Sequence, residues 1–337
     1  MIVKIFQTIT HIKLQGIEFY QTPYFTLTSN QDVKKEHFSN TLFEKAIGSM
    51  RYAKIQTDYD FIFSILKSND LFDEKDLNQM LGENIDLIHQ YANGLASCLW
   101  FIKDNSVNIS EIYGNVIDGG SNSFLCMSPI TVITNCHGDT KEVLFNRSEI
   151  DNAYLISKQY VKICPQKEEE FGNRITEHQF SNHINTSIIK GENDNINYNK
   201  FNRIERAIKF LHIVRETSYL PRKIAMYMPI FECLFSTEPH EVTMKVSERV
   251  AFYIRGEDKK KVYKIIKEAY NLRSRYLHGE ELPNNQKERT YQLELATQID
   301  GIARYVLTRV IMEDSEKFLL KKSDFENWLT DIIFQNG

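Results

Sequence analysis

The sequence lacks the features that define several classes of protein. No apolar run approaches the roughly 20 residues that span a bilayer, and the N-terminal stretch MIVKIFQTITHIKLQ does not have the layout of a signal peptide. The five cysteines include no CxxC pair, which is typical of reduced thiols. With only 14 glycines and 7 prolines, the composition is that of an ordinary globular chain. These features predict a cytoplasmic protein with no membrane-spanning segment.

Common cofactor and nucleophile motifs are also missing. We find no GxGxxG fingerprint, no P-loop and no nucleophile elbow. His178 and His183 are five residues apart, which places them badly for one metal ion on one helix, and no third ligand is evident. Cys136 and His137 fall in a turn cluster without an assignable Asn or Asp partner. We therefore expect no cofactor and no metal site.

The length of 337 residues predicts two domains. The first, 1–164, is predicted to be α+β because period-2 and period-3.6 apolar patterns both occur in it. Strands are predicted at 1–14, 17–28, 107–118, 123–135 and 141–146, with long helices at 74–104 and 150–164. Short helices or mixed elements are expected at 37–50 and 59–70. Residues 165–198 are polar and rich in asparagine, which indicates a linker.

The second domain, 199–337, is predicted to be a bundle of helices. Apolar residues recur there at three- and four-residue spacing, and short polar breaks separate the periodic segments. The predicted helices are 201–219, 222–235, 241–254, 258–278, 286–312 and 323–334. The fold class expected for the whole chain is therefore an α+β domain followed by an all-α domain.

Charge is divided unevenly between the two predicted domains. From Asn199 onward the chain holds 24 Lys and Arg against 20 Asp and Glu, and the part before it holds 17 against 25. The net charges are thus about +4 and −8, although the whole chain is at −4. Much of the basic excess lies between Lys259 and Arg275, which permits a nucleic-acid partner there. A solvated helix face would explain the lysines equally well.

The predicted helix 258–278 is the most informative stretch of the sequence. Asp258 can cap its start, and Gly279 can end it in a left-handed turn. Arg273 falls among the apolar positions of this helix, where a guanidinium needs a carboxylate, carbonyl groups or an anionic ligand. His278 lies at the carbonyl end, about 140° further around the axis, so one straight helix does not bring the two side by side.

The segment RSRYLHG resembles the signature of the HEPN domains, most closely their Apea-like branch. Arg273, Ser274, Leu277, His278 and Gly279 match that pattern position by position. Glu232, Arg249 and Tyr270 also resemble family positions, in the right order and at plausible distances. The resemblance covers roughly residues 201–311 and does not include the first domain.

The resemblance implies a HEPN-like helical bundle and a metal-independent endoribonuclease. In that activity His278 would take the 2′-OH proton of RNA and Arg273 would stabilise the phosphate charge, which leaves a 2′,3′-cyclic phosphate. It also implies a homodimer, with two R-x4-H motifs in one cleft, and a role in antiviral defence by abortive infection. Asn271, Ser274 and Arg275 share a helix side with His278 and could hold phosphate or ribose. Glu232 is expected to support the site by pairing with Arg273 or Arg249.

Two alternatives remain open on the sequence. Arg273 and His278 could serve structure alone, as an ion pair and a helix end, and Asn271 and Arg275 could simply face solvent. The helical domain could also be a non-catalytic module that binds RNA, a nucleotide or a protein partner. The acidic first domain would in either case serve as a sensing or regulatory domain for a trigger ligand or protein.

Overall fold

The structure is a computed structural model that describes residues 2–39, 41–57, 60–67, 74–118, 121–128, 131–164, 200–238, 240 and 242–335. Side chains are described for these residues except 42, 67, 74–80, 118, 121–123 and 335. The chain forms two compact units: 1–135 with 140–155, and 136–139 with 156–337. The predicted linker 165–198, with His178 and His183, lies outside the described residues. Within the described part, no helix is both long enough and apolar enough to cross a membrane.

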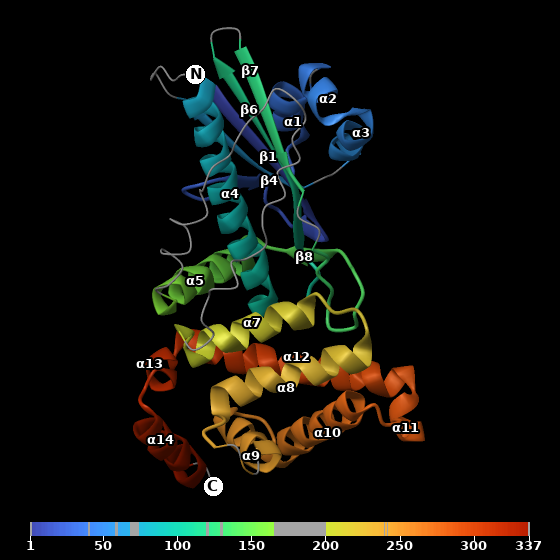
Figure 1. Ribbon diagram of the computed structural model, residues 1–337, viewed down its shortest axis with the longest axis vertical. Coiled ribbons are helices and arrows are strands. Elements are labelled where there is room, and N and C mark those ends of the chain that lie inside the picture. Colours follow the sequence, from blue (N-terminus) through green and yellow to red (C-terminus); the bar gives the residue numbers. More distant parts are fainter. Residues whose placement is uncertain are drawn as a thin grey trace. The chain divides into compact units, whose positions relative to one another are not determined.

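The first unit is built on an antiparallel sheet with the strand order β3-β4-β5-β1-β6-β7. Its strands are β1 (Ile2–Thr10), β3 (Phe19–Gln21), β4 (Thr26–Thr28), β5 (Phe61–Lys67), β6 (Asn108–Asp118) and β7 (Ser121–Met127). A separate parallel pair joins β2 (Ile12–Leu14) to β8 (Val143–Phe145). Helices α1 (Gln31–Phe38), α2 (Thr41–Ile47), α3 (Ser49–Thr57), α4 (Glu74–Ile102) and α5 (Arg147–Ile163) complete the α+β arrangement (Figure 1).

Helices cover both faces of this sheet. On β1 and β6, Phe6 and Tyr113 pack with Phe38 and Phe43 from α1 and α2. The alternate positions face α4, where Gly114 leaves space for Leu81 and Ile85. Both faces of β1 are therefore buried, which explains why consecutive residues from Ile5 to Ile9 are all buried, Gln7 and Thr8 included.

A polar contact joins α4 to the centre of the sheet. The Gln7 side-chain nitrogen lies 2.6 Å from His89 Nδ1, and the amide nitrogen of Asn93 lies 2.8 Å from His89 Nε2. Gln7 is fully buried, and burial lowers the pKa of His89 to about 4. The imidazole is thus held in its neutral form, in which one ring nitrogen can accept from an amide group.

Three local predictions in the first unit were wrong. The stretch 59–70, where short helices or mixed elements were expected, contains strand β5, because its apolar residues pair between β1 and β4. The strand predicted at 123–135 ends at Met127. The single strand predicted at 17–28 is instead a hairpin of β3 and β4. Thr22 stabilises its turn, because the Thr22 hydroxyl oxygen accepts a hydrogen bond from Phe25 N–H at 3.0 Å.

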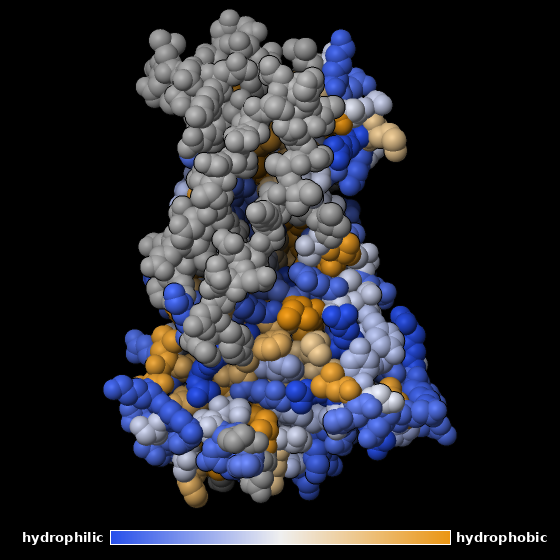
Figure 2. Space-filling view, viewed as in Figure 1, coloured by the Kyte–Doolittle hydropathy of each residue, from blue (hydrophilic) through white to orange (hydrophobic). Residues whose placement is uncertain are grey.

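The second unit is a bundle of helices, as predicted. Its helices are α7 (Arg203–Arg215), α8 (Leu220–Phe235), α9 (Val242–Tyr253), α10 (Lys259–His278), α11 (Asn284–Lys287), α12 (Arg289–Met312), α13 (Ser315–Phe318) and α14 (Lys322–Gln335). The single helix predicted at 286–312 is instead two helices, because Glu288 takes an extended conformation between α11 and α12. The hydrophobic side chains visible over this unit form small, separate patches (Figure 2).

Helix α8 lies at the centre of the bundle. It contacts α7, α9, α10 and α12, and apolar residues are buried around most of its circumference, as in a helix enclosed by others. Tyr227 on α8 donates a hydrogen bond to Asp300 on α12 at 2.6 Å, with both residues buried. Lys223 caps the end of α7 by donating to the carbonyl oxygens of Val214 and Thr217. These contacts fix the helices that carry the candidate site.

Candidate active site on helix α10

Helix α10 has the start and the end that the sequence predicts. The Asp258 carboxylate accepts from the backbone N–H groups of Lys260 and Lys261 at 2.9 and 3.3 Å. Gly279 has φ 70°, and Glu280 N–H returns to the Arg275 carbonyl oxygen at 2.9 Å, which makes a Schellman turn. His278 is therefore held as the last helical residue of α10.

The buried side of α10 fixes its orientation in the bundle. This side packs against α8, α9 and α12. Its buried residues are Val262, Ile265, Ile266, Ala269, Tyr270 and Leu272. Each large apolar side chain among them contributes about 1.5–3 kcal/mol by leaving water. A rotation of α10 that moved His278 would expose this side, so the positions of the polar residues follow from the apolar ones.

Arg273 lies at the edge of this buried side and pairs with Glu232 on α8. The distance from Arg273 Nη1 to Glu232 Oε1 is 3.2 Å, and the two side chains are 29% and 25% exposed. Of the two partners expected for Glu232, the structure thus selects Arg273. The Nε atom of Arg273 is buried and has no hydrogen-bond partner among the described residues. Its guanidinium is therefore held on one side only.

Tyr270 completes this cluster one turn before Arg273. Its side chain is buried, and burial followed by the negative charge of Glu232 raises the pKa of its hydroxyl well above the ordinary value. The phenol consequently stays neutral at physiological pH. It adds an apolar wall beside the ion pair, which strengthens the attraction between Arg273 and Glu232 by excluding water.

Arg249 has a different role from Arg273. Its Nη1 donates to the Phe235 carbonyl oxygen at 2.6 Å and to Thr237 Oγ1 at 3.2 Å. Arg203 donates to the Ser236 carbonyl oxygen at 2.7 Å, and burial lowers the pKa of both guanidinium groups. The two arginines thus satisfy carbonyl groups at the end of α8, a helix terminus that needs such donors.

His278 lies on the exposed side of α10. Its imidazole makes no hydrogen bond or ion pair with any described residue, and it is exposed to solvent. Asn271 and Ser274 are likewise exposed, whereas Arg275 forms a 3.7 Å ion pair with Glu280. The structure therefore brings Asn271, Ser274, Arg275 and His278 to one side of the helix.

Arg273 and His278 are on different sides of the same regular helix. Five residues correspond to about 140° of rotation and about 7.5 Å of rise. Within a single chain, Arg273 faces α8 while His278 faces solvent. One chain therefore does not direct both side chains toward a single phosphate in this arrangement.

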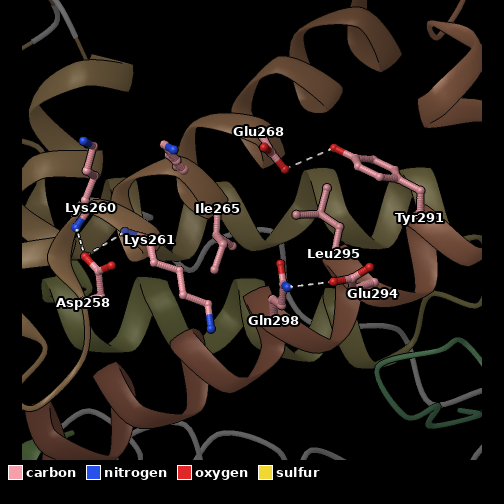
Figure 3. A pocket seen from close by; sticks show the side chains of 10 residues that line it. Asp258, Lys260, Lys261, Ile265, Glu268, Tyr291, Glu294, Leu295 and Gln298 are labelled. Atoms are coloured by element: carbon pink, nitrogen blue, oxygen red, sulfur yellow. Dashed lines mark hydrogen bonds between the residues drawn. The ribbon is translucent and has the colours of Figure 1, made fainter.

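A groove between α10 and α12 adds residues that the sequence did not indicate. It has a volume of about 410 Å³. From α10 it is lined by Asp258, Lys260, Lys261, Lys264, Ile265 and Glu268, and from α12 by Tyr291, Glu294, Leu295 and Gln298 (Figure 3). The Tyr291 hydroxyl donates to Glu268 at 3.3 Å, and Gln298 donates to Glu294 at 3.2 Å. No local motif marks the four residues of α12, since they meet α10 only through helix packing.

The turn that carries Cys136 and His137 also belongs to the second unit. Cys136 is buried, with its sulfur 3.9 Å from Thr297 Oγ1, and His137 Nε2 lies 2.9 Å from the same oxygen. Gly138 follows them with φ 77° and packs against the backbone of Ser218. These contacts attach the turn to the bundle.

Comparisons with known proteins found no similar protein, so a function for this chain has to be argued from its own residues. No protein-family model matches the chain, and neither the curated proteins nor the solved structures contain a match to it.

Proposed function

We propose that this chain is a metal-independent endoribonuclease of the HEPN type. The observation that carries the proposal is the end of α10, where Gly279 fixes an exposed His278 with no partner among the described residues. Five residues before it, Arg273 is only partly engaged by Glu232. In cleavage of RNA by its own 2′-hydroxyl, an imidazole suits the role of the base and a guanidinium suits the role of the cation.

The proposed reaction needs one base and one cation. Neutral His278 removes the proton of the 2′-hydroxyl, and the 2′-oxygen attacks the adjacent phosphorus as the bond to the 5′-oxygen breaks. Arg273 donates two N–H bonds to the phosphate oxygens, whose negative charge grows in the transition state. The departing 5′-oxygen takes a proton from water, and the His278 imidazolium returns its proton to solvent, so the products are a 2′,3′-cyclic phosphate and a 5′-hydroxyl. Glu232 orients Arg273, while Asn271, Ser274 and Arg275 are available to the neighbouring ribose and phosphate.

A homodimer would resolve the separation of the two side chains. In a two-fold dimer the same surface of each copy meets the other, so Arg273 of one copy can approach His278 of the second copy. Such a site predicts complementation: an Arg273→Ala chain mixed with a His278→Ala chain restores one intact site per mixed dimer. Random exchange would give about a quarter of the wild-type rate, because half of the dimers are mixed and each has one good site. If each chain supplied both residues to its own site, the mixture would remain inactive.

The test of the activity is direct. Purified full-length chain is incubated with total RNA in excess EDTA, and the ends of the fragments are analysed. Fragments with 2′,3′-cyclic phosphate that are absent with His278→Ala protein support the proposal. Cleavage that disappears with EDTA and returns with Mg²⁺ or Mn²⁺ contradicts it.

One observation favours a second candidate, a non-catalytic module that binds RNA, a nucleotide or a protein. Arg273 already has a carboxylate partner, and the same chain keeps His278 away from it. In that case His278→Ala would leave binding and any cellular effect unchanged.

The biological setting follows from the resemblance alone. A cytoplasmic ribonuclease of this type would act as a defence effector that arrests growth during infection. The acidic first unit would then control the activity in response to a trigger. Deletion of residues before the predicted linker should change RNA cleavage or toxicity, and an unchanged phenotype with a folded fragment would argue for a passive scaffold.

A further inference from the structure

The exposed side of α10 carries a straight row of polar and basic side chains. Its members recur at three- and four-residue spacing, which keeps them within about 80° of one another around the helix. They are Lys260, Lys264, Lys267, Asn271, Arg275 and His278. From first to last the row is about 27 Å long, because each residue rises 1.5 Å. We call this set the α10 row.

Three lysines of the row lack the ion pairs that several other lysines of this unit have. Lys245, Lys287 and Lys322 each lie within 4 Å of a carboxylate. By contrast, Lys260, Lys264 and Lys267 form no ion pair with any described residue, although all three are exposed. The row itself contains no acidic residue. The three lysines therefore carry uncompensated positive charge along a row that ends at His278, whereas Arg275 is paired with Glu280.

The groove between α10 and α12 lies beside the row and contains charges of both signs. Figure 3 shows Lys260 and Lys261 with Asp258 at one end and the contact between Glu268 and Tyr291 at the other. The apolar side chains of Ile265 and Leu295 lie between them. Carboxylates in the groove would repel phosphate, but they accept hydrogen bonds from ribose hydroxyls and base amino groups.

We infer that the α10 row and the adjoining groove bind single-stranded RNA, with the phosphates along the row and bases in the groove. A positive track beside an aromatic side chain is the usual arrangement for single strands, since a base can stack on the ring. Tyr291 supplies that ring, and the row leads the strand to His278. This inference rests on the proposed function, because the bound single strand would be the substrate that His278 cleaves.

The expected salt dependence gives a quantitative test. Each phosphate neutralised on a single strand adds about 0.7 to the slope of log affinity against log salt concentration. Removal of two contacting lysines should therefore reduce the slope by about 1.4. Lysine and glutamine have similar helix propensity, so exposed Lys→Gln changes should leave folding intact.

The experiment uses full-length His278→Ala protein, which separates binding from cleavage, and a fluorescent oligoadenylate RNA. Lys264→Gln/Lys267→Gln is compared with a control of equal charge change, Lys317→Gln/Lys321→Gln, whose lysines are also exposed and form no ion pair with a described residue. We expect the lower slope and weaker binding only in the first variant. Equal slopes for the two variants, or a parent protein that does not bind at low salt, would overturn the inference.

A second comparison tests the groove. Tyr291→Leu should weaken binding of the oligonucleotide roughly fivefold or more, whereas Tyr291→Phe, which retains the ring, should not. Equal affinity of Tyr291→Leu and Tyr291→Phe, or equally strong binding of a duplex of the same length, would refute the single-strand arrangement. Binding that depends on the row, with a wild-type protein that cuts nothing, would instead refute the ribonuclease and leave the track in place. Cleavage that does not depend on Lys264 and Lys267 would refute the track and leave the ribonuclease in place.

Discussion

The ion pair between Arg273 and Glu232 should be a measurable part of the stability of the helical unit. The two side chains are 29% and 25% exposed, which places the pair between a surface contact and a fully buried one. Exposed pairs contribute about 0–1 kcal/mol, and loss of one partner of a buried pair costs about 3–5 kcal/mol. For Arg273→Ala we therefore expect a loss of about 1–3 kcal/mol, because Glu232 is left partly buried beside Tyr270.

A double-mutant cycle isolates this interaction. Glu232→Gln should also destabilise the protein, but the variant with both changes should be less unstable than the sum, with a coupling of about 0.5–3 kcal/mol. The two tryptophans suit the measurement, since Trp100 is in the first unit and Trp328 in the second. In a Trp100→Phe background, urea unfolding followed by the fluorescence of Trp328 reports on the helical unit, where this ring packs against Tyr253 and Phe318.

The same variants separate stability from chemistry. Glu232→Gln should weaken the fold yet retain cleavage, because the guanidinium remains. Arg273→Lys should keep the positive charge and lose cleavage, because an ammonium group cannot make the two parallel bonds to phosphate. A coupling energy near zero would show that the 3.2 Å contact does not stabilise the protein. Full cleavage by Arg273→Lys would remove the bidentate role.

Three further predictions concern other parts of the chain. His278→Ala should abolish cleavage and change the unfolding free energy by less than about 0.5 kcal/mol, because the side chain is exposed; calorimetry and an RNA assay check both. Gly279→Ala should cost about 1–2 kcal/mol through its positive φ, whereas Gly301→Ala, inside α12 with open space around it, should stabilise by up to about 1 kcal/mol in urea unfolding. The pKa of His89 is about 4 in the folded state against an ordinary value of 6.5, so the free energy of unfolding of the first unit should be constant above pH 6.5 and fall by about 3 kcal/mol toward pH 4. His89→Gln should flatten that pH dependence, and parallel curves for the two proteins would contradict the prediction.

Much of the helical unit could be predicted because local signals there agree. For α10, the Asp258 cap, the apolar period and the Gly279 stop all specify the same ends. The unusual position of Arg273 was also visible, since helical angles place it among the apolar residues. Its partner was not, because Glu232 is 41 positions earlier in the chain and Arg249 was an equally good candidate. Only the packing of α8 against α9 and α10 decides which of the two arginines pairs with Glu232.

The errors have physical causes as well. Strand β5 was misread because a short apolar run such as FIFSIL fits either a helix turn or a buried strand, and only its partners decide. The groove could not be foreseen, because Tyr291 and Glu268 meet through the register of two packed helices. A local pattern determines which residues of a helix are exposed. It does not determine which exposed residues of two helices become neighbours.

The two sides of α10 make the structural and functional interpretations separable. Arg273 and Glu232 form an ion pair that would stabilise a bundle whether or not the protein has an activity. The three lysines of the α10 row have no such use, since exposed lysines without an ion pair contribute little to folding and repel one another. If the helix served structure alone, changes in the row would have no measurable consequence, while changes at the ion pair would. Substitutions in the row that abolish RNA binding and leave the stability unchanged would therefore show that α10 has a function beyond its role in the bundle.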